Sequence, residues 1–295
     1  MSNLTIFIMQ MINGINIGSI YALIALGYTM VYGIAKLINF AHGDIIMVGA
    51  YTVFAATSIL KLPIYLAIIL AIIVCALLGM AIEKVAYKPL RKASRITLLI
   101  TAIGVSYLLE SGFRLIFSSN PKNFPTFINL PPLLIGDVNI SANYYVTFVI
   151  SVAIMIGLER FVQNSQTGRA MRACSEDEGA ARLMGIDVDK TISITFAIGS
   201  ALAAVAGILY CTSYPVITPY LGMLPGIKAF IAAVLGGIGN IKGAVLGAFI
   251  LGILEALTKA YISSQLSDAI VFSILIIMLV FKPAGILGVN RKEKV

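Results

Sequence analysis

Long uncharged stretches alternate with short polar segments along the chain. The clearest stretch covers residues 64–82 without one charged side chain, close to the roughly 20 apolar residues that one transmembrane helix needs. The stretches lack the apolar–polar alternation of barrel strands, and in lipid every backbone group must be paired within the protein. The pattern therefore predicts helical spans, with further ones over about 96–117, 144–161, 243–260 and 269–281.

Two uncharged stretches, residues 1–35 and 191–227, are longer than one span requires. A polar interruption over 36–44 follows the first, and a glycine-rich segment over 228–242 follows the second. Short matches link the two regions: Ile17-Gly-Ser19 with Ile198-Gly-Ser200, and Gly49-Ala-Tyr51 with Gly247-Ala-Phe249. An odd number of spans between the paired elements would give the halves opposite orientations, so we expect an inverted repeat. Chance similarity among small and aliphatic residues is the alternative.

This organisation predicts an all-α, polytopic membrane protein with about eight or nine transmembrane helices arranged as two inverted repeats. The expected divisions are a first repeat over about 1–161, a central loop over about 162–190, a second repeat over about 191–282 and a basic tail over 283–295. Composition agrees, because only 12% of the residues are charged, against roughly 25% in soluble proteins. A lipid bilayer is therefore the expected surrounding.

The basic residues gather in segments 84–95 and 160–190 and in the tail from residue 282. Loops rich in lysine and arginine stay on the cytoplasmic side of a membrane, so we expect the N-terminus outside and the C-terminus in the cytoplasm. Residues 118–143 carry little positive charge and should lie outside. In a soluble protein the net charge of +8 would suggest nucleic acid, but here the charge flanks membrane spans and no nucleic-acid partner is expected.

Residues 167–190 form a polar island in this apolar chain. Ser175 and Glu178 have the spacing of a capping box, and Gly185 is placed to end the helix that the box begins. We therefore predict a short surface helix over about 176–184, on which Ala180, Leu183 and Met184 share one face. That face suits an interaction surface, and packing of the helix on its own bundle is the alternative.

Catalytic chemistry finds little support in the sequence. His42 is the only histidine, Cys75, Cys174 and Cys211 have neither metal-binding nor disulfide spacing, and no Walker A or HExxH motif occurs. We expect no enzyme activity, no catalytic residues, no cofactor and no metal site. Intramembrane charges are scarce, which argues against an ion-coupled carrier. The i,i+4 pairs Glu110–Arg114 and Glu255–Lys259 are interpreted as interfacial pairs. For His42 and Asp44, pathway lining and hydrogen bonding of broken helix ends both remain open.

Two segments carry a resemblance to a known family. They are GIAKLINFAHGDIIMVGAY over residues 33–51 and AFIAAVLGGIGNIKGA over residues 229–244. Both resemble signatures of the permease subunits of high-affinity branched-chain amino acid ABC importers, and the length of the chain favours the shorter of the two permeases in such systems. The resemblance implies a multi-pass protein of the bacterial cytoplasmic (inner) membrane. It also implies a second homologous permease, two ABC ATPases and an extracytoplasmic solute-binding protein as partners.

The resemblance gives roles to the broken segments and to the island. The segments over 39–44 and 236–242 would be mobile and would line the substrate pathway, with Asn39, Phe40, His42, Gly43, Phe230, Gly236, Gly237 and Gly239 as its residues. The island would hold a helix that docks on the ATPase, with Arg172, Ser175, Glu178, Gly179, Ala180, Leu183, Met184 and Gly185 as its residues. The importer pattern Glu-Ala-Ala matches only loosely, because Glu178-Gly-Ala-Ala181 inserts a glycine.

The implied mechanism is alternating access driven by ATP hydrolysis on partner subunits, since the chain has no ATP-binding motif of its own. Urea, amides or another small solute could replace the branched-chain amino acids on the same architecture. A secondary carrier, a channel or a membrane-embedded enzyme fits the residues less well.

Overall fold

The computed structural model describes residues 3–37, 39–91, 93–136 and 138–288, and the protein is almost entirely helical. Six of the described helices are long and apolar enough to cross a membrane. They are α1 (Asn3–Ala35), α3 (Ile64–Ile82), α4 (Arg95–Phe117), α5 (Ala142–Asn164), α8 (Val188–Ser213) and α10 (Ile241–Tyr261). The prediction of an all-α, multi-pass membrane protein is confirmed, and the uncharged stretch over 64–82 is α3 itself.

Shorter elements complete the chain. Three shorter helices are the mostly buried α2 (His42–Ser58) and the apolar α9 (Met223–Gly236) and α11 (Leu266–Phe281). The remaining elements are η1 (Glu83–Tyr87), η2 (Lys88–Leu90), α6 (Gln166–Glu176), α7 (Glu178–Leu183), β1 (Lys122–Asn123), β2 (Leu133–Ile135), β3 (Val138–Ile140) and β4 (Val216–Ile217). Most of the basic tail over 283–295 lies outside the described residues.

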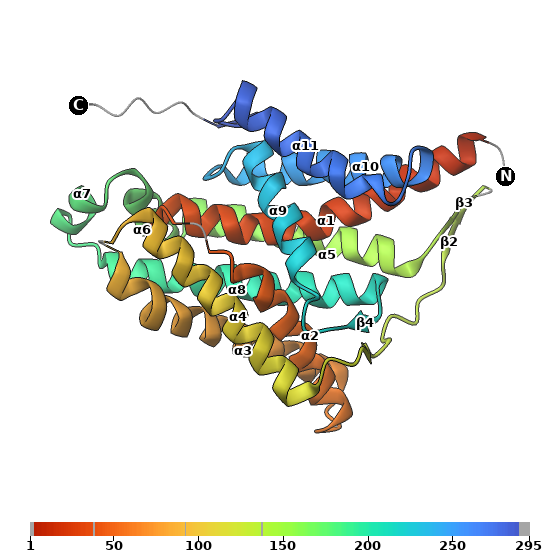
Figure 1. Ribbon diagram of the computed structural model, residues 1–295, viewed down its shortest axis with the longest axis horizontal. Helices are drawn as coiled ribbons and strands as arrows, with labels where there is room; N and C mark the ends of the chain where they lie inside the picture. The colour runs from red at the N-terminus through yellow and green to blue at the C-terminus, as the bar shows by residue number, and fades with distance from the viewer. Residues whose placement is uncertain (1–2, 38, 92, 137, 289–295) are drawn as a thin grey trace.

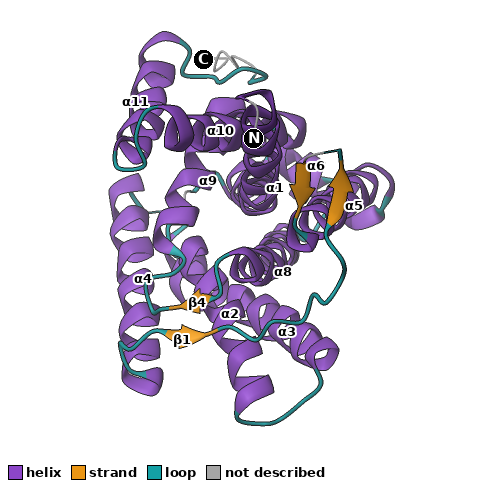
Figure 2. Ribbon diagram, turned by 90° about the vertical axis from the view of Figure 1, so that its right-hand side faces the viewer, coloured by secondary structure: helices purple, strands orange, loops and turns teal. Residues whose placement is uncertain are grey.

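Helix α1 is the centre of the bundle. Within an apolar 18-residue stretch of α1, 89% of the residues are buried in the protein. The corresponding share for α4 is 11%, because its leucine and isoleucine side chains face outward. Figure 2 shows α1 among α5, α8, α9 and α10. Small residues permit this packing, since a Cβ on Gly18 would lie 2.9 Å from the Cα of Phe249 on α10. Without a side chain at Gly18 the two backbones come into direct contact.

The second long helix of the core, α8, packs against α2 and α3 while α1 packs against α9 and α10. A Cβ on Gly49 of α2 would lie 2.9 Å from the Cα of Ala204 on α8, so this contact also depends on glycine. The two oversized stretches differ in structure. Residues 3–35 form one unbroken helix, whereas the stretch over 191–227 is divided between α8 and α9 by an extended segment that contains β4.

The two short sequence matches lie on different pairs of helices. Gly18 and Gly199 lie on α1 and α8, the two long core helices. Gly49 lies on α2, but Gly247 lies on α10, the helix that follows α9. The second match thus pairs α2 with α10, whereas the first pairs α1 with α8, and small residues of this kind recur wherever helices pack closely.

The two ends of the bundle are different. Figure 1 shows α7 at one end and, at the opposite end, the start of α1 with the β2–β3 hairpin. Strand β2 pairs antiparallel with β3, and β1 pairs antiparallel with β4. The β1–β4 pair ties the long loop after α4 to the segment between α8 and α9, so that segment is held on the side away from α7.

Candidate functional site

The polar interruption between α1 and α2 is anchored by hydrogen bonds on both sides. Lys36, in a left-handed backbone conformation with φ of 53°, donates from Nζ to the carbonyls of Gly33 at 2.8 Å and Ser175 at 3.0 Å. The buried Asn39 accepts a 2.8 Å hydrogen bond from the hydroxyl of Tyr87. The break in the helix is thus joined directly to α6 and η1.

After the interruption, the first turn of α2 meets the first turn of α9 inside the bundle. A Cβ on Gly222 would lie 1.8 Å from the carbonyl oxygen of Gly43, and a Cβ on Gly226 would lie 2.8 Å from the Cα of Gly43. No side chain fits between these backbones. Two half-length helices with N-termini in contact at the centre of a bundle are the arrangement that transport proteins use around a pathway.

Aromatic side chains close the space beside this contact. The ring of Tyr28 lies 4.6 Å from that of His42 and 5.7 Å from that of Phe230, and Phe40 lies 5.7 Å from Phe230, centroid to centroid. A cavity of only about 10 Å³ remains next to Tyr28 and Phe230. The structure therefore brings Phe40, His42, Gly43 and Phe230 together and holds them packed shut.

The predicted glycines after α9 lie elsewhere. Gly237 and Gly239 have φ values of 110° and 93°, which favour glycine. The carbonyl of Gly236 accepts a 2.9 Å hydrogen bond from the amide of Leu287, so this turn packs on the end of the described chain. These glycines form a corner between α9 and α10, with Gly239 close to Gly33, and they do not join the cluster of rings around Phe230.

Two buried polar atoms at the start of α2 have no hydrogen-bond partner among the described residues. They are Nε2 of His42 and Oδ2 of Asp44. His42 packs over Gly27, where a Cβ would lie 2.4 Å from Nε2. Unpaired buried polar groups are costly in a packed core, and these two lie where the two half-helices meet.

The polar island folds as two short helices rather than the one predicted. Asp177, not Ser175, caps α7, because its Oδ1 accepts a 2.9 Å hydrogen bond from the amide of Ala180. The hydroxyl of Ser175 donates to the carbonyl of Arg172 within α6. The predicted capping box was therefore wrong, since the neighbouring aspartate took its place. Gly185, with φ of 80°, follows the end of α7 as expected.

Helix α7 exposes its apolar residues at the end of the molecule. Leu183 is 90% exposed and Met184 is 82% exposed, while Ala181 faces inward. Gly179, Ala180 and Gly185 are exposed, and Glu178 is half-buried. Packing of Leu183 and Met184 on their own bundle is thus excluded. Arg172 has a different position, because it donates to the carbonyl of Val162 and ties α6 to α5.

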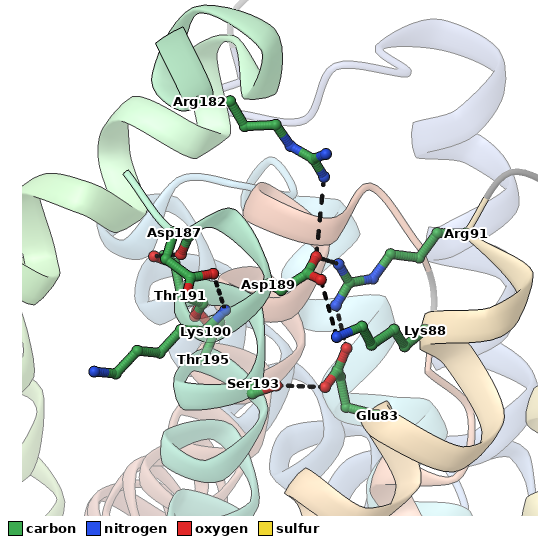
Figure 3. A network of polar contacts seen from close by, with 10 residues as sticks. All are labelled: Glu83, Lys88, Arg91, Arg182, Asp187, Asp189, Lys190, Thr191, Ser193 and Thr195. Atoms are coloured by element: carbon green, nitrogen blue, oxygen red, sulfur yellow. Dashed lines mark hydrogen bonds and ion pairs between the residues drawn. The ribbon is translucent and has the colours of Figure 1, made fainter. Parts of the chain in front are cut away.

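A set of ion pairs joins α7 to the spans, and we name it the α7-end network: Glu83, Lys88, Arg91, Arg182, Asp189 and Ser193. Asp189, at the start of α8, pairs with Arg182 of α7 at 3.9 Å, Lys88 at 2.9 Å and Arg91 at 2.6 Å (Figure 3). Arg91 also pairs with Glu83, which is fully buried and accepts from the hydroxyl of Ser193 on α8. The network therefore links α7, α8 and the segment after α3.

A second ionic group, which we name the Glu255 cluster, consists of Tyr21, Lys228, Glu255, Lys259 and Asp268. Oε1 of Glu255 accepts from Lys228 at 2.7 Å and from Lys259 at 2.6 Å, and its Oε2 accepts from Tyr21 at 2.8 Å. Lys228 also pairs with Asp268 at 2.7 Å. The predicted pair of Glu255 with Lys259 is therefore present, but Glu255 is 1% exposed and the pair belongs to a larger cluster inside the bundle.

The Glu255 cluster lines a cavity of about 230 Å³ between α1, α8, α9, α10 and α11. Tyr210, Tyr214, Leu224, Ile17 and Ile20 are further lining residues. Since one water molecule needs roughly 10–15 Å³, the cavity has room for several water molecules or a small ligand beside these charges. It is much larger than the space beside Phe230.

A protein-family model covers residues 10–279 of the chain, and its description is the permease component of branched-chain amino acid transport systems. The chain belongs to this family. The match includes both half-helices, the island and the Glu255 cluster, so it does not rest on a single motif.

Several relatives of this permease are similar over nearly their whole length. The high-affinity branched-chain amino acid transport system permease protein LivH of Salmonella typhimurium is 44% identical, with 98% of each chain covered. Permease protein BraD of Pseudomonas aeruginosa is 45% identical, again with 98% of each chain covered. A probable LivH of Methanocaldococcus jannaschii is 32% identical over 93% of this permease and 90% of its own length. No solved structure matches the permease significantly.

Sequence reasoning missed two groups of residues in this permease. Glu83, Arg91 and Asp189 lie on segments about a hundred residues apart, so no local spacing reveals the α7-end network. Lys228 was detectable only as a single charge in apolar surroundings, and Glu255 only as the i,i+4 partner of Lys259. In membrane proteins such charges are functional candidates by default, and this rule was the one available signal.

Proposed function

We propose that this chain is a permease subunit of an ABC importer that carries branched-chain amino acids. The observation that supports it best is the full-length similarity to relatives described as permeases of such systems. The multi-pass fold agrees, and the absence of a Walker A sequence leaves ATP hydrolysis to other subunits.

The proposed partners are two ABC ATPases, a second homologous permease and an extracytoplasmic solute-binding protein. Exposed apolar residues at Leu183 and Met184, beside the half-buried Glu178, support docking of an ATPase on α7. Large apolar side chains at the polar end of a membrane protein suit a protein partner, because neither water nor lipid tails would cover them there.

We propose that the α7 end faces the cytoplasm of a bacterial inner membrane. Lys88, Arg91 and Arg182 gather at this end, as the positive-inside rule requires. The start of α1 lies at the opposite end in Figure 1, which supports an external N-terminus. By the same reasoning, the tail that begins after Lys282 would be cytoplasmic.

We also propose that the two halves are inverted repeats that move against each other. The start of α2 at His42 and the start of α9 at Met223 are separated by the same 181 positions as Ile17 and Ile198. In the resulting mechanism, ATP binding displaces α7, and Asp189 passes the movement to Arg91 and Glu83. The contact between Gly43 and Gly226 then opens as the half-helices separate, and Phe40, His42 and Phe230 uncover the pathway.

Reconstitution of the complete importer tests the proposal. Proteoliposomes that contain both permeases, both ATPases and ATP should accumulate labelled leucine, isoleucine and valine when the solute-binding protein is added outside. Omission of any subunit should abolish accumulation. Preferential accumulation of urea or an amide, or accumulation without ATP, would contradict the proposed function.

A further inference from the structure

The Glu255 cluster has no role in the movement described above, yet its Lys228–Glu255 pair is the most buried ion pair that the structure describes. A buried ion pair is a weak source of stability, because the cost of removing two charges from water often exceeds their attraction. Lys228 is 5% exposed and Glu255 is 1% exposed. Their presence beside a cavity of about 230 Å³ calls for a ligand rather than a packing explanation.

The charged groups of the cluster have bonding capacity to spare. A lysine ammonium has three N–H donors, and within the described part of the chain Lys228 uses two of them, on Glu255 and Asp268. Lys259 uses one, on Glu255. Asp268 binds Lys228 through Oδ1, and its side chain is half-exposed, so its second carboxylate oxygen can accept a further hydrogen bond. The cavity therefore offers further donors and a further acceptor side by side.

We propose that this cavity binds the transported solute as a zwitterion: Lys228 and Lys259 hold an α-carboxylate, and Asp268 holds the α-ammonium group. Two cations and two carboxylates face one another here. A zwitterion adds no net charge to such a site, whereas a simple anion or cation would leave one buried charge unpaired. This inference rests on the proposed transport function and adds a binding site to it.

The remaining wall of the cavity suits an aliphatic side chain. Ile17, Ile20 and Leu224 are apolar, and the rings of Tyr210 and Tyr214 present mixed surfaces. Small-molecule sites combine convergent polar groups with apolar walls, and this cavity has both kinds of lining in similar measure. The same cavity would thus distinguish an aliphatic amino acid from a polar one by desolvation of the side chain.

The site also connects to the half-helices. Lys228 lies on α9, and Leu224 and Pro225 belong to its first turn, next to the contact between Gly226 and Gly43. A solute bound by Lys228 would therefore contact α9, the helix whose N-terminus packs against the start of α2. Binding from the outer side would precede separation of α2 and α9.

A cysteine at the rim of the cavity provides the test. Ser264 is exposed and lines the cavity, and the three native cysteines are buried. In the complete importer in nanodiscs, a membrane-impermeant maleimide should label Ser264→Cys, and mass spectrometry of this chain measures the rate. Leucine should slow labelling by about tenfold. The analogues 4-methylpentanoate, without the ammonium group, and 3-methylbutylamine, without the carboxylate, should have little effect.

Two further variants show whether the charges cause the protection. In the Ser264→Cys background, Lys228→Gln and Asp268→Asn should each remove most of the protection by leucine. Asp268 is half-exposed, so its replacement serves if Lys228→Gln does not fold. The matched control is Glu159→Gln, which removes a carboxylate from an ion pair with Lys242 outside the cavity and should preserve protection.

The result that overturns the inference is labelling that leucine does not slow, or protection that survives in both charge variants. Equal protection by either analogue also contradicts a zwitterion site. Leucine uptake by the same importer with its solute-binding protein is measured separately. If uptake occurs without protection, the binding site is wrong and the proposed function stands. If no branched-chain amino acid is taken up, the proposed function itself fails.

Discussion

In the α7-end network, buried Glu83 binds Arg91, and Arg91 binds the half-exposed Asp189. In the Glu255 cluster, buried Glu255 binds Lys228, and Lys228 binds the half-exposed Asp268. The chemistry is the same, but the surroundings differ. The first network is packed between α7, α8 and the end of α3, with Ser193 as an additional donor, whereas the second lines a cavity of about 230 Å³.

This difference separates two uses of buried charge in one membrane protein. Packed ion pairs between helices act as a mechanical connection, because each charge loses its partner if one helix moves alone. Ion pairs at a cavity can exchange partners with a solute, because a charged group that leaves its partner there can form hydrogen bonds with water or with the ligand. We therefore assign transmission of movement to the α7-end network and binding of solute to the Glu255 cluster.

The largest effect that we expect is on stability, and it differs between replacement of buried Glu83 and replacement of buried Glu255. Glu83→Gln should lower the free energy of unfolding by roughly 3–5 kcal/mol, because Arg91 loses a buried partner. Glu255→Gln should cost only roughly 1–3 kcal/mol, since water in the cavity rehydrates Lys228 and Lys259. Unfolding by SDS in mixed micelles measures both values.

The exposed pair Glu159–Lys242 again supplies the control for that comparison. Glu159→Gln should change the free energy of unfolding by about 1 kcal/mol or less. Equal losses of unfolding free energy for Glu83→Gln and Glu255→Gln would show that the cavity does not rehydrate Lys228 and Lys259. The distinction between the two networks would then be contradicted.

The next effect concerns docking on α7. Charge reversal of Glu178 to Lys together with Leu183→Asp should weaken binding of the ATPase subunits at least about tenfold, because an exposed apolar contact is lost and a charge is inverted. Pull-down from detergent extracts measures recovery, and membrane insertion of the variant should be normal. Glu176→Lys, at the end of α6, is the control. Normal ATPase recovery with the double variant would refute the docking assignment.

The smallest effect tests the cap of α7. Asp177→Ala removes the acceptor for the amide of Ala180 and should destabilise this short helix by about 1 kcal/mol. Hydrogen exchange of the α7 amides should accelerate by about fivefold, the factor that corresponds to this free energy, while the exchange rates in α6 stay unchanged. Ser175→Ala should leave α7 unaffected, and acceleration with Ser175→Ala instead would restore the capping box predicted from the sequence.

The sequence predicted the spans well where charge marks their ends. Helix α3 follows the uncharged stretch over 64–82, and α4 and α5 follow the next predicted spans within a few residues. The break between α8 and α9 was missed, because residues 214–222 contain no charge. Pro215, Pro219 and Gly222 were the only local signals there.

The site could be predicted only in part. The resemblance named Phe40, His42 and Phe230, and periodicity placed Ala180, Leu183 and Met184 on one face, but exposure of that face was left open. The capping box failed because Asp177 competes locally for the same amides. Beyond the Glu255–Lys259 pair, the Glu255 cluster was missed for a different reason. Its members lie on α1, α9, α10 and α11, and a single sequence does not show which distant charges meet.

The most direct test of the division between the two networks is the number of leucine molecules imported per ATP hydrolysed in reconstituted proteoliposomes. Asp189→Asn should lower this ratio at every concentration of loaded solute-binding protein, because hydrolysis continues while movement of α7 no longer reaches Arg91. Asp268→Asn should lower it only below saturation, because solute binding is weakened but transmission is intact. A wild-type ratio for Asp189→Asn, or a deficit in Asp268→Asn that saturation does not relieve, would contradict the account.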